Sequence, residues 1–133
     1  MEEQTNLLNK IPNHISEEIK NAINDFIVEV ISNLGNKVEK IYLYGSMARG
    51  DYNKDSDIDI MILINSNKEE MIKDRRLIAD LAYDIEEKYN FSIWISPIVK
   101  NFYYFFDKLE YSYFYTNVEK EGVELFSWKI KYQ

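Results

Sequence analysis

A Gly-Ser pair and an Asp pair in the middle of the chain have the residue types and spacing needed for metal and phosphate chemistry. Ten residues separate Ser46 of the first pair, Gly45-Ser46, from Asp57, and Asp59 follows two positions later. Because successive side chains of a strand point to opposite faces, Asp57 and Asp59 are expected to project from the same face. Two adjacent carboxylates repel each other unless a cation neutralises them. Mg²⁺ is suited to this role, since it is usually held by one or two carboxylates together with substrate phosphates.

The residues before the acidic pair offer groups that bind phosphate. Gly45 can adopt a positive φ and lets the backbone approach a ligand closely, and Ser46 adds a hydroxyl beside exposed N–H groups. Arg49 offers a planar guanidinium for a further phosphate oxygen. Together these groups predict a metal-bound nucleoside triphosphate at a phosphoryl-transfer centre. In this interpretation Asp57 and Asp59 are the catalytic and metal-binding residues.

Predicted strands place the two pairs at neighbouring strand ends. Short apolar runs rich in β-branched residues predict one strand over 38–44, which leads into the Gly-Ser pair, and a second that opens at 56–57 and runs to 64. A third strand is predicted over 91–95, with Pro97 at its end or edge.

Two helices are predicted to pack on the sheet. The first follows Ser16 as its N-cap, carries apolar residues at helical spacing and ends at Gly35. The second is predicted over about 69–88. Its charged residues are expected to form a solvated face, which includes Asp74, Arg75 and Arg76.

The run Gly45-Ser46-Met47-Ala48-Arg49-Gly50, together with Ser56-Asp57-Ile58-Asp59, resembles the signature of the DNA polymerase beta-like nucleotidyltransferases. More narrowly, it resembles the stand-alone minimal nucleotidyltransferases of bacteria and archaea. The resemblance is strongest over 41–64 and extends more loosely to 93–99 and 119–123. It implies an α+β fold with a mixed β-sheet and helices packed on it. It also implies transfer of a nucleoside monophosphate, AMP from ATP, with Mg²⁺ held by Asp57 and Asp59 and the nucleotide bound by Gly45, Ser46, Arg49 and Ser56.

The same resemblance implies a protein partner. Minimal nucleotidyltransferases often lie beside HEPN-type proteins, and some of these pairs act as toxin and antitoxin. The acceptor hydroxyl is therefore expected on such a partner, as a tyrosine of a HEPN-type toxin, and the chain is expected to act as an antitoxin by AMPylation.

The predicted third strand departs from the pattern of the polymerase beta-like enzymes. These enzymes usually carry a third carboxylate there, which helps to deprotonate the acceptor, and Ser92 is the position where it is expected. General-base help is typically worth about 10²–10⁴-fold in rate. Without it, an enzyme favours an acceptor that ionises easily, and a tyrosine phenol with a pKa of about 10 is such a group. The missing acid is equally compatible with a non-catalytic homologue.

The segment 101–122 is unusually aromatic. As a single helix it would be apolar on both sides, so one side would need a second chain, either a homodimer partner through 102–115 or another protein. If the helix breaks near 111–112, both sets of aromatic residues can fold inward and no partner is required.

Composition limits the remaining possibilities. A chain of 133 residues is one domain of ordinary size, here interpreted as a flexible arm over 1–15 and a single domain over 16–133. A net charge of −7 argues against a long nucleic acid as partner. The absence of cysteine fits a reducing cytoplasm, and no apolar run approaches the roughly 20 residues that span a membrane.

Two other functions remain open. One is a small-molecule adenylyltransferase that modifies antibiotics, which needs a further helical region that this chain has no room for unless a dimer supplies it. The other is a non-catalytic nucleotidyltransferase-like module that binds a partner through its acidic surface and aromatic segment.

Overall fold

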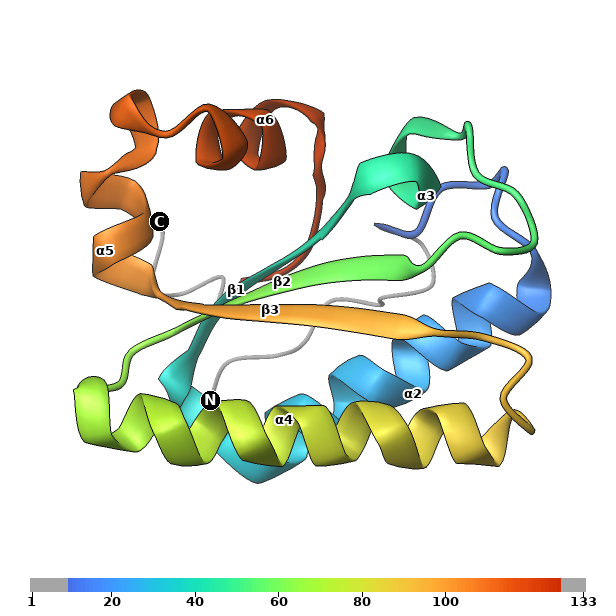
Figure 1. Ribbon diagram of the computed structural model, residues 1–133, viewed down its shortest axis with the longest axis horizontal. Coiled ribbons are helices and arrows are strands. Elements are labelled where there is room, and N and C mark those ends of the chain that lie inside the picture. Colours follow the sequence, from blue (N-terminus) through green and yellow to red (C-terminus); the bar gives the residue numbers. More distant parts are fainter. Residues whose placement is uncertain (1–9, 128–133) are drawn as a thin grey trace.

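A four-stranded mixed sheet organises the computed structural model, which describes residues 10–127 (Figure 1). The strands β1 (Val38–Tyr44), β2 (Ile58–Ile64), β3 (Ile95–Asn101) and β4 (Val123–Ser127) lie in the order β3-β2-β1-β4. β1 is antiparallel to β2 and to β4, whereas β2 and β3 are parallel. The first two strands lie where the sequence predicts them, although β2 begins one residue after Asp57.

Two long helices cover one face of the sheet (Figure 1). α2 (Glu17–Leu34) begins at Ser16, whose hydroxyl accepts a hydrogen bond from the N–H of Ile19, and its C-cap is Gly35. A turn of 3-10 helix, η1 (Gly35–Lys37), leads from it into β1. α4 (Lys68–Lys88) begins with a capping box between Asn67 and Glu70. Both helices are confirmed as predicted.

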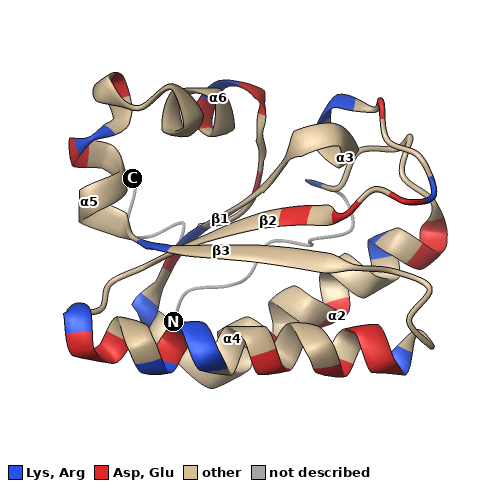
Figure 2. Ribbon diagram, in the orientation of Figure 1, with Lys and Arg blue, Asp and Glu red and all other residues tan. Residues whose placement is uncertain are grey.

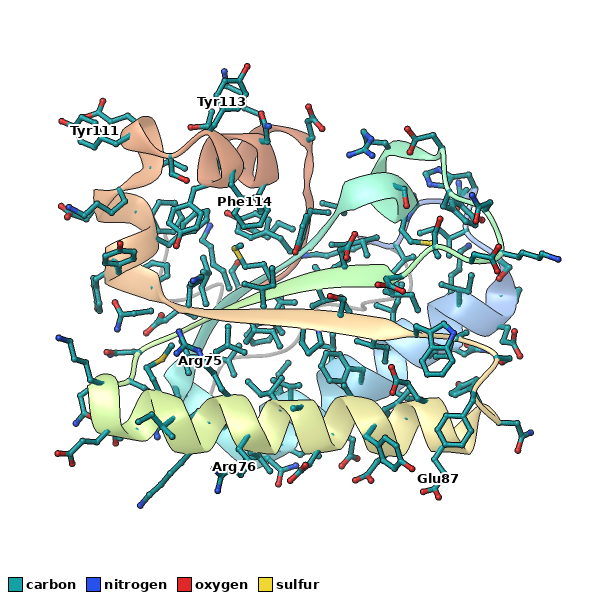
Figure 3. All side chains as sticks on the ribbon, viewed as in Figure 1. Arg75, Arg76, Glu87, Tyr111, Tyr113 and Phe114 are labelled. Atoms are coloured by element: carbon teal, nitrogen blue, oxygen red, sulfur yellow. The ribbon has the colours of Figure 1, made fainter. Side chains whose placement is uncertain are left out.

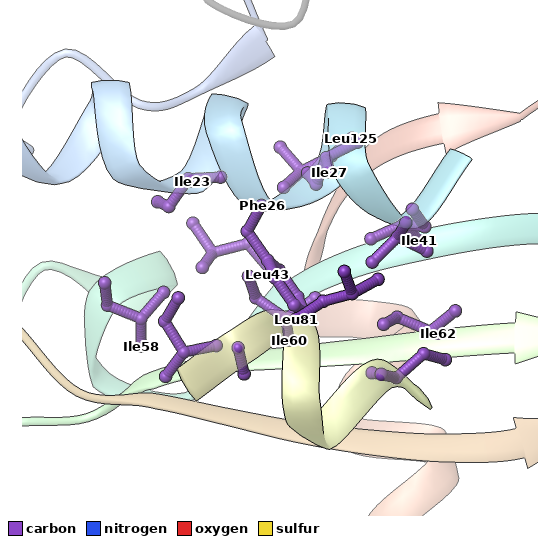
Figure 4. Packing of buried hydrophobic residues seen from close by; sticks show 14 of the residues in the cluster. Ile23, Phe26, Ile27, Ile41, Leu43, Ile58, Ile60, Ile62, Leu81 and Leu125 are labelled. Carbon is purple, nitrogen blue, oxygen red and sulfur yellow. The ribbon is translucent and has the colours of Figure 1, made fainter. Parts of the chain in front are cut away.

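The main hydrophobic core lies between these helices and the sheet (Figure 4). Phe26 and Ile27 of α2 are fully buried against this face, as are Ile41 and Leu43 of β1. Alternate residues of each strand point to the core, which leaves the intervening side chains of β1 and β2 for the opposite face. Asp57 and Asp59 belong to that opposite face.

The opposite face is covered only in part. The aromatic segment forms α5 (Phe102–Asp107), a turn of 3-10 helix η2 (Leu109–Tyr111) and α6 (Tyr113–Glu121), so it is broken near 111–112. Phe105 and Tyr115 pack into a second core, but other aromatic side chains stay exposed. The break was one of the two predicted arrangements; the expectation that it lets both aromatic sets fold inward is wrong.

The third strand starts later in the chain than the sequence predicts. β3 begins at Ile95 and runs to Asn101, whereas residues 89–94 form an irregular turn in which Asn90 and Phe91 have positive φ values of 56° and 58°. A left-handed backbone cannot continue a strand, so pairing with β2 starts only after this turn. Pro97 lies within β3, which is an edge strand, as expected for proline in a sheet.

Other details also differ from expectation. The described part of the predicted arm is packed, since Ile11 and Ile15 lie in the main core. The ring of His14 lies close to Met47, with 2.7 Å between His14 Nε2 and the Met47 carbonyl oxygen. On α4, Asp74 is buried rather than solvated, and it accepts a 2.6 Å hydrogen bond from Ser66. The predicted arm over 1–9 lies outside the described residues.

Within residues 10–127, no helix is both long and apolar enough to cross a membrane.

Candidate active site

Strand register brings the Gly-Ser pair to the acidic pair. β1 and β2 pair so that Tyr44, the last residue of β1, lies opposite Asp59. Gly45 follows directly with φ of +74° and begins the short helix α3 (Gly45–Arg49). A Cβ at position 45 would collide with the carboxylate of Asp59. The two halves of the predicted site are therefore in contact, although Gly45 and Asp59 are 14 positions apart in the sequence.

The carboxylate of Asp59 is half-buried and lies near other charges. Partial burial is the main cause of its raised pKa, and the neighbouring charge of Asp57 raises that pKa further. Arg49 acts in the opposite direction. Asp57 itself is exposed. The charges of Asp57 and Asp59 therefore interact, and such a pair fits a divalent cation, because a cation would reduce both the repulsion and the cost of desolvation.

The remaining predicted nucleotide-binding residues differ in their roles. Ser46 lies in the first turn of α3, beside the glycine that touches Asp59. Arg49 ends α3 and is exposed, with its Nε 3.4 Å from Asp51 and its Nη1 3.9 Å from Glu121. Ser56 holds the preceding turn, since its hydroxyl accepts a 3.0 Å hydrogen bond from the N–H of Asn53. The hydroxyl of Ser56 is thus engaged within the loop.

The position of the expected third carboxylate moves with the corrected strand. Ser92 lies before β3, and its hydroxyl donates to the carbonyl of Tyr89. Ser96 is the residue that pairs with Asp59 across the parallel β2–β3 ladder. No acid occurs in β3, and no group of three acidic or histidine side chains that could hold a metal is found among residues 10–127. The expectation that Ser92 occupies this position is wrong, but the position is still a serine.

Comparison with known proteins identifies the family. The sequence profile of the family described as "Nucleotidyltransferase domain" matches residues 23–125. The chain belongs to this nucleotidyltransferase family.

Two proteins of Methanocaldococcus jannaschii resemble this nucleotidyltransferase in sequence. The one named "Putative protein adenylyltransferase MJ0141" is 33% identical over 108 residues, which span 81% of this chain and 99% of the relative. The one named "Putative protein adenylyltransferase MJ0604" is 35% identical over 105 residues, which span 79% of this chain and 95% of the relative. These relatives and the family match identify the chain as an enzyme of the nucleotidyltransferase kind.

Solved structures resemble the nucleotidyltransferase in fold. A crystal structure of the toxin-antitoxin with AMP-PNP matches with a TM-score of 0.50 and 18% identity, over 80% of this chain and 74% of that chain. A mutant of the toxin-antitoxin MntA-HpeT matches with the same TM-score and identity, over 79% of this chain and 73% of that chain. The shared fold is the polymerase beta-like α+β arrangement predicted from the sequence.

Two aromatic side chains, Tyr44 and Phe114, lie beside the site of the nucleotidyltransferase. Tyr44 lies opposite Asp59, and its ring meets that of Phe114 from α6 edge-to-face, with 5.6 Å between the ring centroids. Burial raises the pKa of Tyr44 to about 12, with a smaller contribution from the charge of Asp59. Tyr44 is therefore neutral at physiological pH. Its contact with Phe114 links the site to the aromatic C-terminal segment, a link that sequence spacing did not predict.

Proposed function

We propose that the nucleotidyltransferase transfers AMP from ATP to a hydroxyl group of a protein partner. The observation that supports this most directly is the contact between Gly45 and Asp59, because it joins a phosphate-binding loop to a carboxylate pair at one strand end. The names of the two archaeal relatives, and the AMP-PNP in a structure of similar fold, point in the same direction.

The site residues fit a bound Mg²⁺. Asp57 and Asp59 would hold it, since their mutual repulsion contributes to the raised pKa of Asp59. When bound, the ion would neutralise phosphate charge as the reaction proceeds. The backbone at Gly45 and the hydroxyl of Ser46 would face the triphosphate, and Arg49 would turn from its exposed carboxylate partners to a phosphate oxygen.

The reaction forms a bond between the acceptor oxygen and the α-phosphorus of ATP. The bond between the α-phosphorus and the bridging oxygen breaks, and pyrophosphate leaves. The acceptor proton passes to solvent, because the residue of β3 that faces Asp59 is Ser96 and not an acid. A tyrosine phenol, which ionises more easily than an aliphatic alcohol, is therefore the proposed acceptor, and a HEPN-type toxin is its proposed carrier.

Label transfer tests the proposal. The purified protein is incubated with Mg²⁺, the product of the neighbouring gene and ATP labelled either on the α-phosphate or on the γ-phosphate. We expect the α-label to become attached to the partner and the γ-label to appear only as pyrophosphate. Loss of transfer in the Asp57→Asn and Asp59→Asn variants would assign the reaction to this site. Transfer that survives both substitutions would contradict the proposal.

A non-catalytic binding role is the second candidate. The feature that favours it is that, among residues 10–127, no third acidic side chain joins Asp57 and Asp59 in a metal-binding group. In that case the Asp57→Asn/Asp59→Asn double variant would still bind and neutralise its partner. A homodimer through 102–115 and an antibiotic acceptor are further alternatives, which size-exclusion chromatography and a panel of aminoglycosides would test.

A further inference from the structure

Three adjoining hollows follow β3 from the start of α4 to α6, and we call them together the β3 groove. They measure about 420, 760 and 380 Å³. Lys100 lines all three, so the hollows adjoin one another. Arg75 lines two of them and Tyr104 lines two. The groove begins beside Ser96, which pairs with Asp59, and runs along β3 away from the Gly-Ser pair.

Positive charge gathers in the groove although the protein is acidic overall. Its cations are Lys68, Arg75, Lys100 and Lys108, and none of the described residues that line it is Asp or Glu. Neither Lys68 nor Lys100 forms an ion pair with a described carboxylate, and Arg75 donates to the carbonyl of Val99. Lys108 lies 3.8 Å from the exposed carboxylate of Asp107. In Figure 2 the Lys and Arg at the end of β3 and the start of α4 lie far from the acidic start of β2, although Asp and Glu of α4 and of the α5–α6 segment lie nearby. Several cations in a depression that is lined by no described carboxylate favour an anionic ligand.

Aromatic rings accompany the cations. Tyr111 and Phe114 line the groove with 80% and 41% of their surface exposed, and Figure 3 shows them on the side of the molecule that carries α5 and α6. The ammonium of Lys108 lies 6.0 Å from the centre of the Tyr104 ring. Exposed tyrosine and phenylalanine beside cations form a surface that suits a protein segment with both acidic and apolar side chains.

The groove leads to the catalytic pair. Ile98 lines two of the hollows and lies two residues beyond Ser96, which pairs with Asp59. At a rise of about 3.3 Å per residue, Ile98 is about 7 Å and Lys100 about 13 Å along the strand from that pair. Consider an extended segment bound with its acceptor hydroxyl at Asp59. The side chains two to four residues from the hydroxyl-bearing residue would then lie in the groove.

Strand addition is not the mode of docking that the groove favours. The outward N–H of Ile95 donates to Glu86 at 2.8 Å, Pro97 has no N–H, and the carbonyl of Val99 accepts from Arg75. These three features protect the free edge of β3. A segment bound here would meet side chains, so its charge and aromatic content would decide its affinity.

We propose that the β3 groove docks an acidic segment of the acceptor protein, with carboxylates about two to four residues from the modified hydroxyl. This assignment of the groove to the acceptor rests on the proposed function. A protein segment is favoured over a nucleic acid because a phosphodiester chain longer than the groove would meet a protein of net charge −7.

Equilibrium binding of a defined probe tests the groove without any reaction. The probe is a short fluorescein-labelled peptide of alternating glutamate and tyrosine, followed by fluorescence anisotropy in the absence of ATP. We expect Lys100→Glu/Lys108→Glu to weaken binding about tenfold, since each reversed charge turns an attraction into a repulsion. Two milder variants serve if the double variant does not fold. Lys108→Glu changes an exposed side chain, and Lys100→Met removes a charge without reversing it; each should weaken binding less than the double variant does.

A matched control separates the groove from overall charge. Lys73→Glu/Arg76→Glu changes the net charge equally, at exposed positions of α4 outside the groove, and Figure 3 shows Arg76 on the side of α4 away from the sheet. We expect this variant to keep the wild-type affinity for the peptide. Equal losses in the two double variants would overturn the proposal, as would failure of the wild-type protein to bind the peptide.

Further outcomes distinguish other occupants. Tighter binding of a single-stranded oligonucleotide than of the acidic peptide would overturn the proposal in favour of nucleic acid. A wild-type dimer that the groove variant dissociates would assign the groove to a second copy of this chain. Loss of Mg²⁺-ATP binding in the groove variant, measured by calorimetry, would assign it to the nucleotide. Peptide binding that is retained while AMP transfer fails would contradict only the proposed function.

Discussion

The carboxylate of Asp59 lies against the backbone of Gly45 and near the charged carboxylate of Asp57. Without a cation, desolvation and repulsion make this position unfavourable for an ionised group. We therefore expect Asp59→Asn to have opposite effects on stability and on activity. Without Mg²⁺ at neutral pH, the variant should unfold at a higher temperature than the wild type, because a neutral amide of similar shape removes repulsion and desolvation. Transfer should fall by about 10²-fold or more. Thermal unfolding and α-label transfer measure the two effects, and a variant that is both less stable and fully active would contradict this view.

The same residue predicts a pH dependence of folding. Because its pKa is raised in the folded state, Asp59 contributes stability that is fully present at low pH, below its unfolded pKa, and is lost as the pH rises through its folded pKa. The difference in unfolding free energy between wild type and Asp59→Asn should therefore grow with pH across that interval. Urea titrations at several pH values measure it, and saturating Mg²⁺ should abolish it.

Gly45 provides a steric test of the site. Both Gly45 and Gly35 have positive φ, but a Cβ at Gly35 meets nothing within 4 Å, whereas one at Gly45 collides with Asp59. Gly45→Ala should cost about 1–3 kcal/mol more unfolding free energy than Gly35→Ala, because both suffer backbone strain and only one suffers the collision. Urea denaturation compares them. Adding Asp59→Gly should recover the difference, and equal losses in the two single variants would argue against the contact.

At the scale of elements, the edge of β3 shows how helix α4 positions the site. Glu86 of α4 accepts a 2.8 Å hydrogen bond from the N–H of Ile95, the first residue of β3. This bond fixes where the strand begins after the left-handed turn, and so fixes which residue faces Asp59. Ser96 faces Asp59 because β3 starts at Ile95, and the apolar pattern of residues 91–95 does not predict that start.

We expect Glu86→Ala to lower the unfolding free energy by about 1 kcal/mol, because the Ile95 N–H loses a charged acceptor. Glu87→Ala is the matched control, since Glu87 is exposed on the same helix (Figure 3), and it should change stability by less than about 0.5 kcal/mol. Hydrogen exchange of the Ile95 amide should accelerate only in the Glu86 variant. Equal exchange in both variants would contradict the assigned role.

At the scale of the whole molecule, tyrosines that are buried or partly buried connect stability to alkaline pH. Burial is the main cause that raises the pKa of Tyr42, Tyr44 and Tyr89 to about 12 in each case. A raised folded pKa means that the neutral phenols stabilise the fold below the unfolded pKa of about 10, and that this stability is lost as the pH rises from about 10 to about 12.

The protein should therefore lose stability steeply over that alkaline interval. Absorbance of ionised tyrosine and far-ultraviolet circular dichroism, recorded together, should show late titration of the buried phenols accompanied by unfolding. Tyr44→Phe should reduce the slope of stability against pH, whereas Tyr113→Phe, at an exposed site, should not. Titration of all tyrosines near pH 10 in a folded protein would contradict the burial.

The N-terminal segment shows why local patterns miss long-range contacts. Residues 10–15 carry too few apolar positions to predict a buried element, yet Ile11 and Ile15 are in the core. The ring of His14 packs beside Tyr52, whose hydroxyl donates to the His14 carbonyl at 2.9 Å. These partners are distant in sequence, so no periodicity within the segment could reveal them. The same holds for Asp74, which reads as part of a charged face but is buried beside Lys37 and Ser66.

The sequence by itself determined the two long helices, the first two strands and the acidic pair, because each depends on residues close together in the chain whose spacing matches a helix or strand period. Only the tertiary structure decided which residue of β3 faces Asp59, how the aromatic segment folds and which cations line the β3 groove. These features depend on contacts between segments far apart in the chain. Strand register and the packing of one element on another set such contacts, and local spacing does not encode them.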